Sequence, residues 1–553
     1  MILSSADNAA ILASTTYMRK LLSVETNPAL DLVVSRGKLV ARLCELIVAE
    51  STPAIQFEAA WAVTNISSGS STHCGAAMNH GAHSKFLHVL ANSTNVELKE
   101  QCVWGLGNIA GDGVHARDMC LSEGALDAIL TCFPHHNPAA PHPPKSFLRN
   151  AAWAMSNMLR GSPQPPFTDS QRDAMVCLCR LTMDACGRAQ GKEWACSSGD
   201  SEILVDAAWG LSYLTNGSDS RLAALCSINA AGGACPGIID QLVASLGSEK
   251  AVVRTPCLRT VGNIVTGSSA HVAAVVSAGF LDHVVGLMKD SKRTLRKEAC
   301  WALSNITADT DTHKQQVVMV PECAATLLKC INDSEDIAKE AAYVLANLFE
   351  QCEDSGIVSM ALDTGYFGVL LACSARFSSS GGPSQVCEEG IHAICSTCSV
   401  HPHIRDKVWS VVQTQPACAS LLAAAGDTGM ELVELLGEHF GEETVTKALG
   451  DMDYDAAVAS LQSRLDGTAP LVSFGAGSGA KGKGKSNETT ATSARPPAAG
   501  LKNNDAAAAA LAAHMPPPSP QESDQPLANV ELAPDNVSES GSDDDSDDDE
   551  VPP

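Results

Sequence analysis

The sequence repeats one pair of side chains, a tryptophan followed four residues later by an asparagine. Because four positions turn an α-helix by about 400°, both side chains project from one face, one turn apart. The clearest copies are Trp61/Asn65 in FEAAWAVTNISSG, Trp104/Asn108 in QCVWGLGNIAGD, Trp153/Asn157 in NAAWAMSNMLRG and Trp301/Asn305 in KEACWALSNITA. Weaker copies are Trp209/Tyr213, Arg259/Asn263 and Tyr343/Asn347. This recurrence predicts a repeat protein built from helices.

The first residue of each pair, which we call the lead residue, recurs at intervals of 43, 49, 56, 50, 42 and 42 residues. A unit of about 42 residues lies in the armadillo range, where two or three helices bury their apolar faces only against neighbouring units. The longer intervals coincide with polar or Pro-rich insertions after Phe133, Cys196 and Asn229, which a solenoid accommodates in loops. A glycine before an apolar helical run supports the same phase. These glycines are Gly37, Gly81, Gly124, Gly279 and Gly365.

Composition agrees with stacked helices, because 45% of the 553 residues are apolar and only 4% are aromatic. We predict an all-α, right-handed armadillo-repeat superhelical solenoid over residues 28–466, with about nine repeats and the last ending near 450–466. Residues 1–27 are predicted to be a partial first repeat. Residues 467–553 are Gly-, Ser- and Pro-rich and acidic, with few large apolar side chains, and this composition predicts a disordered tail.

The net charge of -26 limits the kinds of partner that the chain can bind. From Asn503 onward there are 13 acidic residues and no Lys or Arg. Such a field repels nucleic acid and attracts basic ligands. No signal-peptide pattern and no apolar run of 18 residues is present, so we expect a soluble, intracellular protein that does not bind membranes. In that setting the 21 cysteines are interpreted as small buried apolar side chains.

Three local motifs have competing interpretations. His392, Cys395 and Cys398, with His401 and His403 beyond, have a spacing that zinc could use, but a second ligand pair is missing and core packing is favoured. The segment 479–486, GAKGKGKS, matches a phosphate-binding loop with Lys485 as its lysine. It lacks the flanking strand and helix, so a flexible basic linker is favoured. Ser540, Ser542 and Ser546 precede acidic residues and are candidate phosphorylation sites.

A ladder of asparagines is not what an apolar core stripe predicts, because a buried carboxamide without partners costs about 1–3 kcal/mol. On a surface, the same ladder can bind the backbone of an extended peptide without reading its sequence. Neighbouring indoles then form slots for the aliphatic stems of Lys or Arg, with cation–π attraction. Asp112, Asp206 and Glu340 lie within a turn or two of the ladder, and their charges favour an ammonium or a guanidinium.

At these residues the chain resembles the importin-alpha family, the adaptors that bind basic nuclear localization signals. The resemblance covers about residues 12–450 and rests on strings such as RKLLS, AIQFEAAWAVTNISSG, VWGLGNIAGD and RKEACWALSNITA. It implies a major signal site at Trp61, Asn65, Gly69, Trp104, Asn108, Asp112, Trp153, Asn157, Asp206 and Trp209. It implies a minor site at Arg259, Asn263, Val265, Thr266, Trp301, Asn305, Glu340, Tyr343 and Asn347. The resemblance implies no cofactor and no metal.

Departures from the family pattern modify these expectations. Cys74 stands where the major site has a threonine, and Val272 and Tyr343 replace a threonine and a tryptophan of the minor site, which we therefore expect to be the weaker one. RKLLS already begins at Arg19, so we expect the importin-beta-binding segment of the family to be absent. The segment 429–449 resembles the closing repeat where the nuclear export receptor docks. Extended through Leu465, it also faintly resembles a three-helix ubiquitin-binding module, and we favour the closing repeat.

Three classes of function remain open. The resemblance favours a nuclear import adaptor found in cytoplasm and nucleus, which binds cargo proteins and has no catalytic activity. The alternative is a general armadillo-repeat scaffold that binds other extended peptides. A nucleotide-using enzyme would rest only on the segment 479–486, and no catalytic constellation stands above background.

Overall fold

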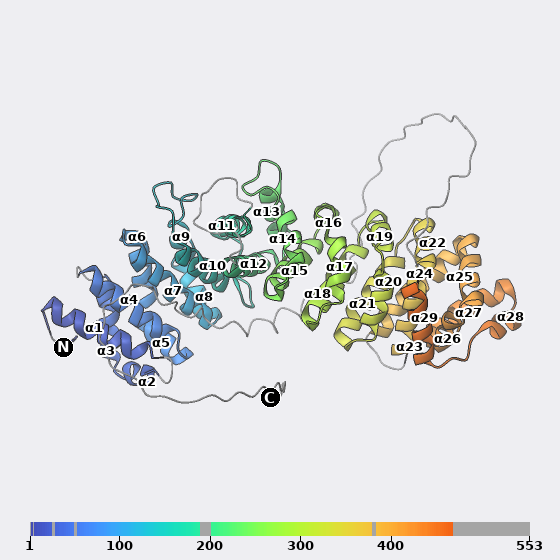
Figure 1. Ribbon diagram of the computed structural model, residues 1–553, viewed down its shortest axis with the longest axis horizontal. Coiled ribbons are helices and arrows are strands. Elements are labelled where there is room, and N and C mark those ends of the chain that lie inside the picture. The colour runs from blue at the N-terminus through green and yellow to red at the C-terminus, as the bar shows by residue number, and fades with distance from the viewer. Residues whose placement is uncertain are drawn as a thin grey trace, which may run out of the picture.

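The computed structural model describes residues 2–3, 5–24, 28–48, 52–187, 201–378 and 383–467. Within these ranges all regular elements are helices. They follow one another along an elongated body, from α1 at one end to α27 and α28 at the other (Figure 1). This is the stacked all-α armadillo arrangement that the repeat spacing predicts.

One set of helices, which we call the ladder helices, carries the lead positions, and each packs against the next in the set. Their bounds are α1 (Asn8–Leu22), α4 (Pro53–Ser67), α7 (Val96–Asp112), α10 (Lys145–Leu159), α12 (Ser201–Thr215), α15 (Ala251–Val265), α18 (Arg293–Thr307), α21 (Glu335–Phe349), α24 (Pro383–Val400) and α27 (Gly426–Phe440).

A second set, the backing helices, packs against the ladder helices. Their bounds are α3 (Gly37–Val48), α6 (Ala82–Asn92), α9 (Ala125–Leu130), α11 (Asp169–Ala185), α14 (Ile238–Ala244) with the short 3-10 turn η1 (Ser245–Gly247), α17 (Phe280–Met288), α20 (Cys323–Ile331), α23 (Tyr366–Phe377) and α26 (Pro416–Ala424).

Shorter helices link most ladder helices to the following backing helix. They are α2 (Leu30–Val34), α5 (Ser71–Asn79), α8 (Val114–Ser122), α13 (Asp219–Asn229), α16 (Ser269–Ser277), α19 (Asp311–Val318), α22 (Ser355–Asp363) and α25 (Pro402–Thr414). The core between the sets is rich in buried Ala, Leu, Val and Cys side chains. The cysteines of the described part are free thiols, and most are buried.

The glycines before the backing helices have a backbone reason. Gly81, Gly124, Gly279 and Gly365 each cap such a helix with φ between 73° and 91°, a conformation that glycine adopts without the steric cost of a Cβ. Gly37 is different, because it is the first residue of α3 and is not among the residues with positive φ.

Two of the three predicted insertions are loops in the structure. They are residues 131–144, between α9 and α10, and residues 230–237, between α13 and α14. The third falls mostly on 197–200, outside the described residues, and Ser201 already begins α12. The solenoid thus absorbs extra length between helices without interrupting the ladder stack.

The carboxyl end of the described part does not form a compact three-helix module. Helix α28 (Glu442–Ala448) packs on α27, whereas α29 (Tyr454–Gly467) turns back and packs against α26, α23 and α20. The Tyr454 hydroxyl donates to Asn332 Oδ1 at 3.1 Å, across 122 residues of chain. This packing covers three consecutive backing helices (Figure 1).

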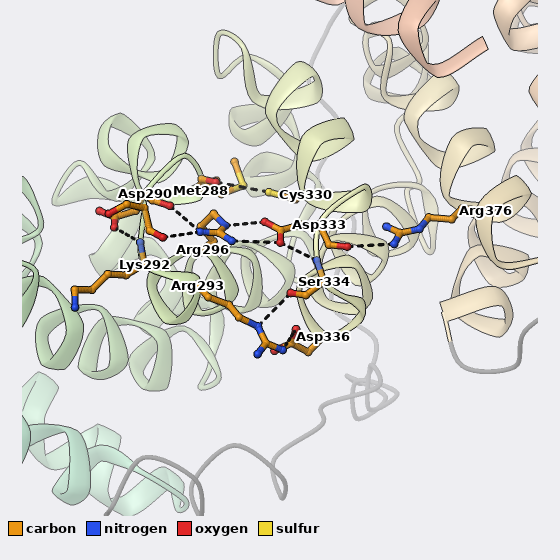
Figure 2. A network of polar contacts seen from close by, with 11 residues as sticks. Met288, Asp290, Lys292, Arg293, Arg296, Cys330, Asp333, Ser334, Asp336 and Arg376 are labelled. Carbon is orange, nitrogen blue, oxygen red and sulfur yellow. Dashed lines mark hydrogen bonds and ion pairs between the residues drawn. The ribbon is translucent and has the colours of Figure 1, made fainter. Parts of the chain in front are cut away.

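Ion pairs and hydrogen bonds around Arg296 and Asp333 also join consecutive repeats (Figure 2). Arg296 donates from Nε to Asp333 Oδ2 at 2.7 Å and from Nη1 to the Asp290 carbonyl at 2.9 Å. Arg376 donates to the Asp333 carbonyl at 3.1 Å. The hydrogen bonds from Arg296 lower the pKa of Asp333. One arginine therefore connects the loops before two successive ladder helices.

Among the described residues, no single helix has the length and apolar composition to cross a membrane. Two bent pairs pass that test only when their helices are counted together, α16 with α17 and α22 with α23.

Candidate peptide-binding groove

The asparagines of the ladder bind the preceding repeat. Asn108, Asn157, Asn263 and Asn347 donate from Nδ2 to the carbonyls of Thr64, Gly107, Ser212 and Ser304, at 3.2, 3.2, 2.8 and 3.0 Å. Each acceptor lies three residues after the preceding lead residue. Asn108, Asn157 and Asn263 are only 5–9% exposed. These carboxamides are therefore less free than the prediction assumed, because a buried amide needs a partner. At Asn108, Asn157 and Asn347, one N–H of Nδ2 and the Oδ1 atom remain for a ligand. Asn263 also donates from Nδ2 to Thr215 Oγ1 at 3.1 Å, which leaves only its Oδ1 atom.

The tryptophans also pack on the preceding repeat, through small residues. A Cβ atom placed on Gly107 would lie 2.4 Å from Trp153, and one placed on Gly262 would lie 2.4 Å from Trp301. The position three after each lead residue is small in this chain: Thr64, Gly107, Ser156, Ser212, Gly262, Ser304 and Ala346. This periodic small residue was a sequence signal that our prediction did not use. At Gly107 it provides both the surface for the next indole and the carbonyl for the next asparagine.

A cavity of about 350 Å³ opens where α4, α7, α10 and α12 meet. The predicted major-site residues that line it are Gly69, Asn108, Asp112, Trp153, Asn157 and Trp209. Trp61, Asn65 and Trp104 lie farther along the same ladder stack and do not line this cavity, and neither does Asp206 on α12. The Asn65 amide donates to Ser23 Oγ at 2.8 Å, so the ladder continues onto α1.

Two further side chains of the cavity were absent from the predicted site. Tyr213 stacks on Trp209, with ring centroids 5.9 Å apart and an angle of 21° between the rings. Arg160 donates from Nη2 to the Gly111 carbonyl at 3.0 Å. A positive charge therefore stands in the wall of a slot predicted to take cations, and it restricts where a ligand cation can lie.

Cys74 does not line the cavity, although its position was predicted to contribute to the major site. Its side chain is fully buried. Burial raises the pKa of the thiol to about 12, with a further increase from the nearby Asp112 charge. The thiol therefore stays neutral and contributes packing.

The acidic residues differ in their surroundings. Asp112 is exposed, and its carboxylate makes no ion pair or side-chain hydrogen bond within the described ranges. Burial, together with a smaller effect of the Glu202 charge, raises the pKa of Asp206 to about 7. Burial also raises the pKa of Glu340 to about 7, where Lys297 opposes the effect and Glu298 adds to it. Among the described residues, neither carboxyl has a cation at hydrogen-bond distance, and such a cation would lower the pKa.

Two tryptophans of the ladder are covered by arginines of the chain itself. The guanidinium carbon of Arg19 lies 4.4 Å from the ring centroid of Trp61, and Arg19 Nε pairs with Glu58 Oε2 at 2.8 Å. The guanidinium carbon of Arg259 lies 5.4 Å from the ring centroid of Trp301, and Arg259 pairs with Glu298. Arg259, which the resemblance assigns to the minor site, is therefore already engaged within the chain.

The remaining predicted minor-site residues are less uniform than those of the major site. The Asn305 amide donates to the Trp301 carbonyl of its own helix at 2.8 Å, so it does not bind the preceding repeat. Val265 and Val272 are buried, and Thr266 Oγ1 donates to the Asn263 carbonyl at 2.7 Å. Tyr343 is half-buried, and burial raises the pKa of its hydroxyl.

Of the three motifs with competing interpretations, only the His392/Cys395/Cys398 group lies among the described residues. Cys395 and Cys398 are buried, and His392 Nδ1 lies 3.0 Å from Glu431 Oε1. In the described part of the chain, no group of three or more His, Cys, Asp or Glu side chains could hold a metal ion. The segment 479–486 and Ser540, Ser542 and Ser546 lie outside the described residues.

Comparison with known families and structures points to armadillo proteins. The family model described as "Armadillo/beta-catenin-like repeat" matches residues 268–308, which span α16 to α18. The crystal structure of an engineered protein aligns with 79% of this chain and 97% of its own, with a TM-score of 0.61 and 21% identity. At that identity the likeness concerns the fold alone.

Curated relatives are importin alpha subunits. Importin subunit alpha-1b of Oryza sativa subsp. japonica is 38% identical over 272 residues, which are 49% of this chain and 45% of that protein. Importin subunit alpha-2 of Arabidopsis thaliana is 41% identical over 218 residues, 39% of this chain and 36% of the relative. Probable importin subunit alpha-A of Dictyostelium discoideum is 35% identical over 271 residues, 48% and 45% of the two chains. The matches span about half the length of these relatives.

Proposed function

We propose that this chain, an armadillo-repeat protein of the importin-alpha family, is a nuclear import adaptor that binds basic nuclear localization signals of cargo proteins in the groove along its ladder helices. It would act by binding, without catalysis, and would move between cytoplasm and nucleus. A nuclear export receptor would be a transport partner, as in the family. These roles agree with the relatives' names.

The observation that carries the proposal is the way the chain binds its own arginines. At Trp61 and at Trp301, a guanidinium lies over the indole and pairs with the carboxylate three residues before it. Asp206 stands three residues before Trp209, and Glu340 three before Tyr343, but in the described ranges no arginine pairs with either carboxyl. A Lys or Arg side chain of a bound peptide would complete the same arrangement there.

The cavity supports a ligand that approaches as an extended chain. Asn108 and Asn157 come from two consecutive ladder helices, and Asp112 lies beside them with its carboxylate exposed. Carboxamides can bind a peptide backbone, whereas the exposed acid selects for a basic side chain. The two together favour a basic extended peptide over a neutral one.

Fluorescence titration tests the proposal directly. A labelled peptide with a cluster of four or five Lys and Arg residues should bind the full chain, and the same peptide with Gln in place of the basic residues should bind at least a hundredfold more weakly. Because exposed ion pairs are screened, affinity should also fall with added salt. Equal affinity for both peptides would favour the alternative, a general armadillo scaffold for extended peptides.

A further inference from the structure

We infer that Arg19 and Arg259 are built-in occupants of two additional cation-binding slots, at Trp61/Glu58 and Trp301/Glu298, which take a Lys or Arg side chain of a bound peptide when the arginine is removed. The inference rests on the proposed function and deepens it. It assigns to these two arginines the role of setting where along the groove a basic peptide can place its charges.

The first slot lies at the amino-terminal end of the ladder, between α1 and α4. Arg19 makes two hydrogen bonds to Glu58, from Nε at 2.8 Å and from Nη2 at 3.3 Å. Its guanidinium carbon stands 4.4 Å from the ring centroid of Trp61. The side chains of Arg19 and Glu58 are only 17% and 15% exposed. The cation is therefore held between an indole and a carboxylate, largely out of water.

The second slot repeats this arrangement between α15 and α18. Arg259 pairs with Glu298 and stands over Trp301, with 15% and 7% of the two charged side chains exposed. The sequence separations are the same in both slots, because each glutamate follows its arginine by 39 residues and precedes its tryptophan by three. Because the same Arg/Glu/Trp arrangement occurs in two separate repeats, we attribute it to the equivalent positions of these residues in the repeat.

The neighbouring positions show what the arginine changes. In both slots, the arginine pairs with the residue that stands three before the next lead residue. Arg259 is itself a lead residue, and Arg19 stands 42 residues before Trp61, at the corresponding position of α1. Where the corresponding residue is Trp153 or Trp301, the carboxyl three before the next lead residue is Asp206 or Glu340. Neither makes an ion pair within the part of the chain that the structure describes, although the Lys297 charge acts on Glu340. Where the corresponding residue is Arg19 or Arg259, that carboxyl is a glutamate already paired. The remaining residues three before a lead residue are Gln101, Asn150 and Pro256, which carry no charge.

This division predicts a limit on ligand length. A basic peptide over the major-site residues cannot extend its charges past Trp61, because Arg19 occupies the next slot. A peptide that runs continuously toward Trp301 meets Arg259 in the slot before it. The charges of a long uninterrupted basic peptide should therefore find no unpaired carboxylate at these two positions.

The experiment uses the full chain and labelled peptides of alternating Lys and Arg, four to twelve residues long, measured by fluorescence anisotropy. For the unmodified chain, affinity should rise with length and then level off. Arg19→Gln should move the plateau to longer peptides and bind the longest one about three- to tenfold more tightly, without a change for the shortest. The double variant Arg19→Gln/Glu58→Gln should return to the unmodified profile, since the new slot has lost its carboxylate.

The second pair of variants, Arg259→Gln and Arg259→Gln/Glu298→Gln, should show the same gain and loss for the longest peptides. Arg259→Lys, which keeps the charge, should leave the profile unchanged. Circular dichroism and thermal unfolding confirm folding. Glu58 lies at the end of the solenoid, so the Arg19 series can be read even if a variant at the more buried Glu298 unfolds.

Several results would overturn the inference. An unmoved plateau in Arg19→Gln, or a gain that persists in Arg19→Gln/Glu58→Gln, would mean that Arg19 only holds α1 against α4. Failure of the proposed function looks different, because the unmodified chain would then bind neither short nor long basic peptides in preference to the Gln-substituted peptide.

Discussion

The two halves of the ladder use the same positions and differ in what the preceding repeat places over them. In the amino-terminal half, Trp153 and Trp209 line an open cavity beside an exposed Asp112. In the carboxyl half, Trp301 is covered by Arg259, and the Asn305 amide bonds to its own helix. The contrast teaches that an intact Trp/Asn pair does not by itself make an open slot. The side chain that the neighbouring repeat contributes decides whether the slot is open or occupied.

The largest effect is expected from reversing the charge of Asp112, the exposed acid beside the cavity of the amino-terminal half. Asp112→Lys should reduce affinity for a basic peptide by at least a hundredfold, because it removes an attraction and adds a repulsion, together several kcal/mol. Peptide titration measures the effect. Glu97→Lys is the matched control, since Glu97 is exposed on the same helix, outside the cavity. A similar loss in both variants would assign the effect to overall charge.

A peptide with two basic clusters compares both halves in one molecule. It should bind more tightly than either cluster alone, because the second contact forms at the effective concentration set by the linker. We expect a gain of roughly tenfold, since Arg259 already occupies part of the carboxyl half. Titration with both clusters and with each cluster separately measures it. Identical affinities for the complete peptide and its better half would show that the carboxyl half takes no cation.

The buried acid Asp206 should make the stability of the amino-terminal half depend on pH. Its pKa in the folded chain is about 7, above the ordinary value of 3.8, so the folded state holds a proton that the unfolded chain has lost. Stability from this group is complete below about pH 4 and is lost as pH rises through 7. Asp206→Asn should therefore raise Tm at pH 8 by about 1 °C, a gain of about 1 kcal/mol in a solenoid of this size, with little change near pH 4.

The same variant should act in the opposite direction on binding. A bound cation favours the ionised carboxylate, so affinity of the unmodified chain should rise from pH 6 to pH 8 as Asp206 loses its proton. Asp206→Asn should flatten that rise. Glu340→Gln provides the counterpart in the carboxyl half, because burial also raises the pKa of Glu340 to about 7. A pH profile unaltered in both variants would contradict this assignment.

The smallest expected effect separates the two kinds of ladder asparagine. Asn157→Ala leaves the Gly107 carbonyl without its donor from the next repeat, and should cost about 1–2 kcal/mol of unfolding free energy. Asn305→Ala removes only a bond within one helix and should cost less, about 0.5 kcal/mol. Urea unfolding monitored by circular dichroism measures both. Equal costs would mean that the bond between repeats has no special weight.

The recurrence of Trp and Asn at four-residue spacing was enough to predict a stack of helices, the phase of the repeats and the positions of most insertions. Six residues of the predicted major site line one cavity. The reason is local: helical geometry fixes which side chains share a face, and unit length fixes how the faces align. The small residue three positions after each lead residue was also visible in the sequence, although its double role as packing surface and hydrogen-bond acceptor was not.

Only the tertiary structure decided which slots are open. That Arg19 covers Trp61 and Arg259 covers Trp301 depends on contacts between residues 42 apart. The sequence places the charges, but burial decides that Asp206 and Glu340 hold protons near neutral pH while Asp112 lies exposed. Burial and pairing arise from the neighbouring repeat, whose distance and angle no local pattern determines. The sequence by itself therefore determined the ladder, and the packing of one repeat on the next decided which of its positions can bind a ligand.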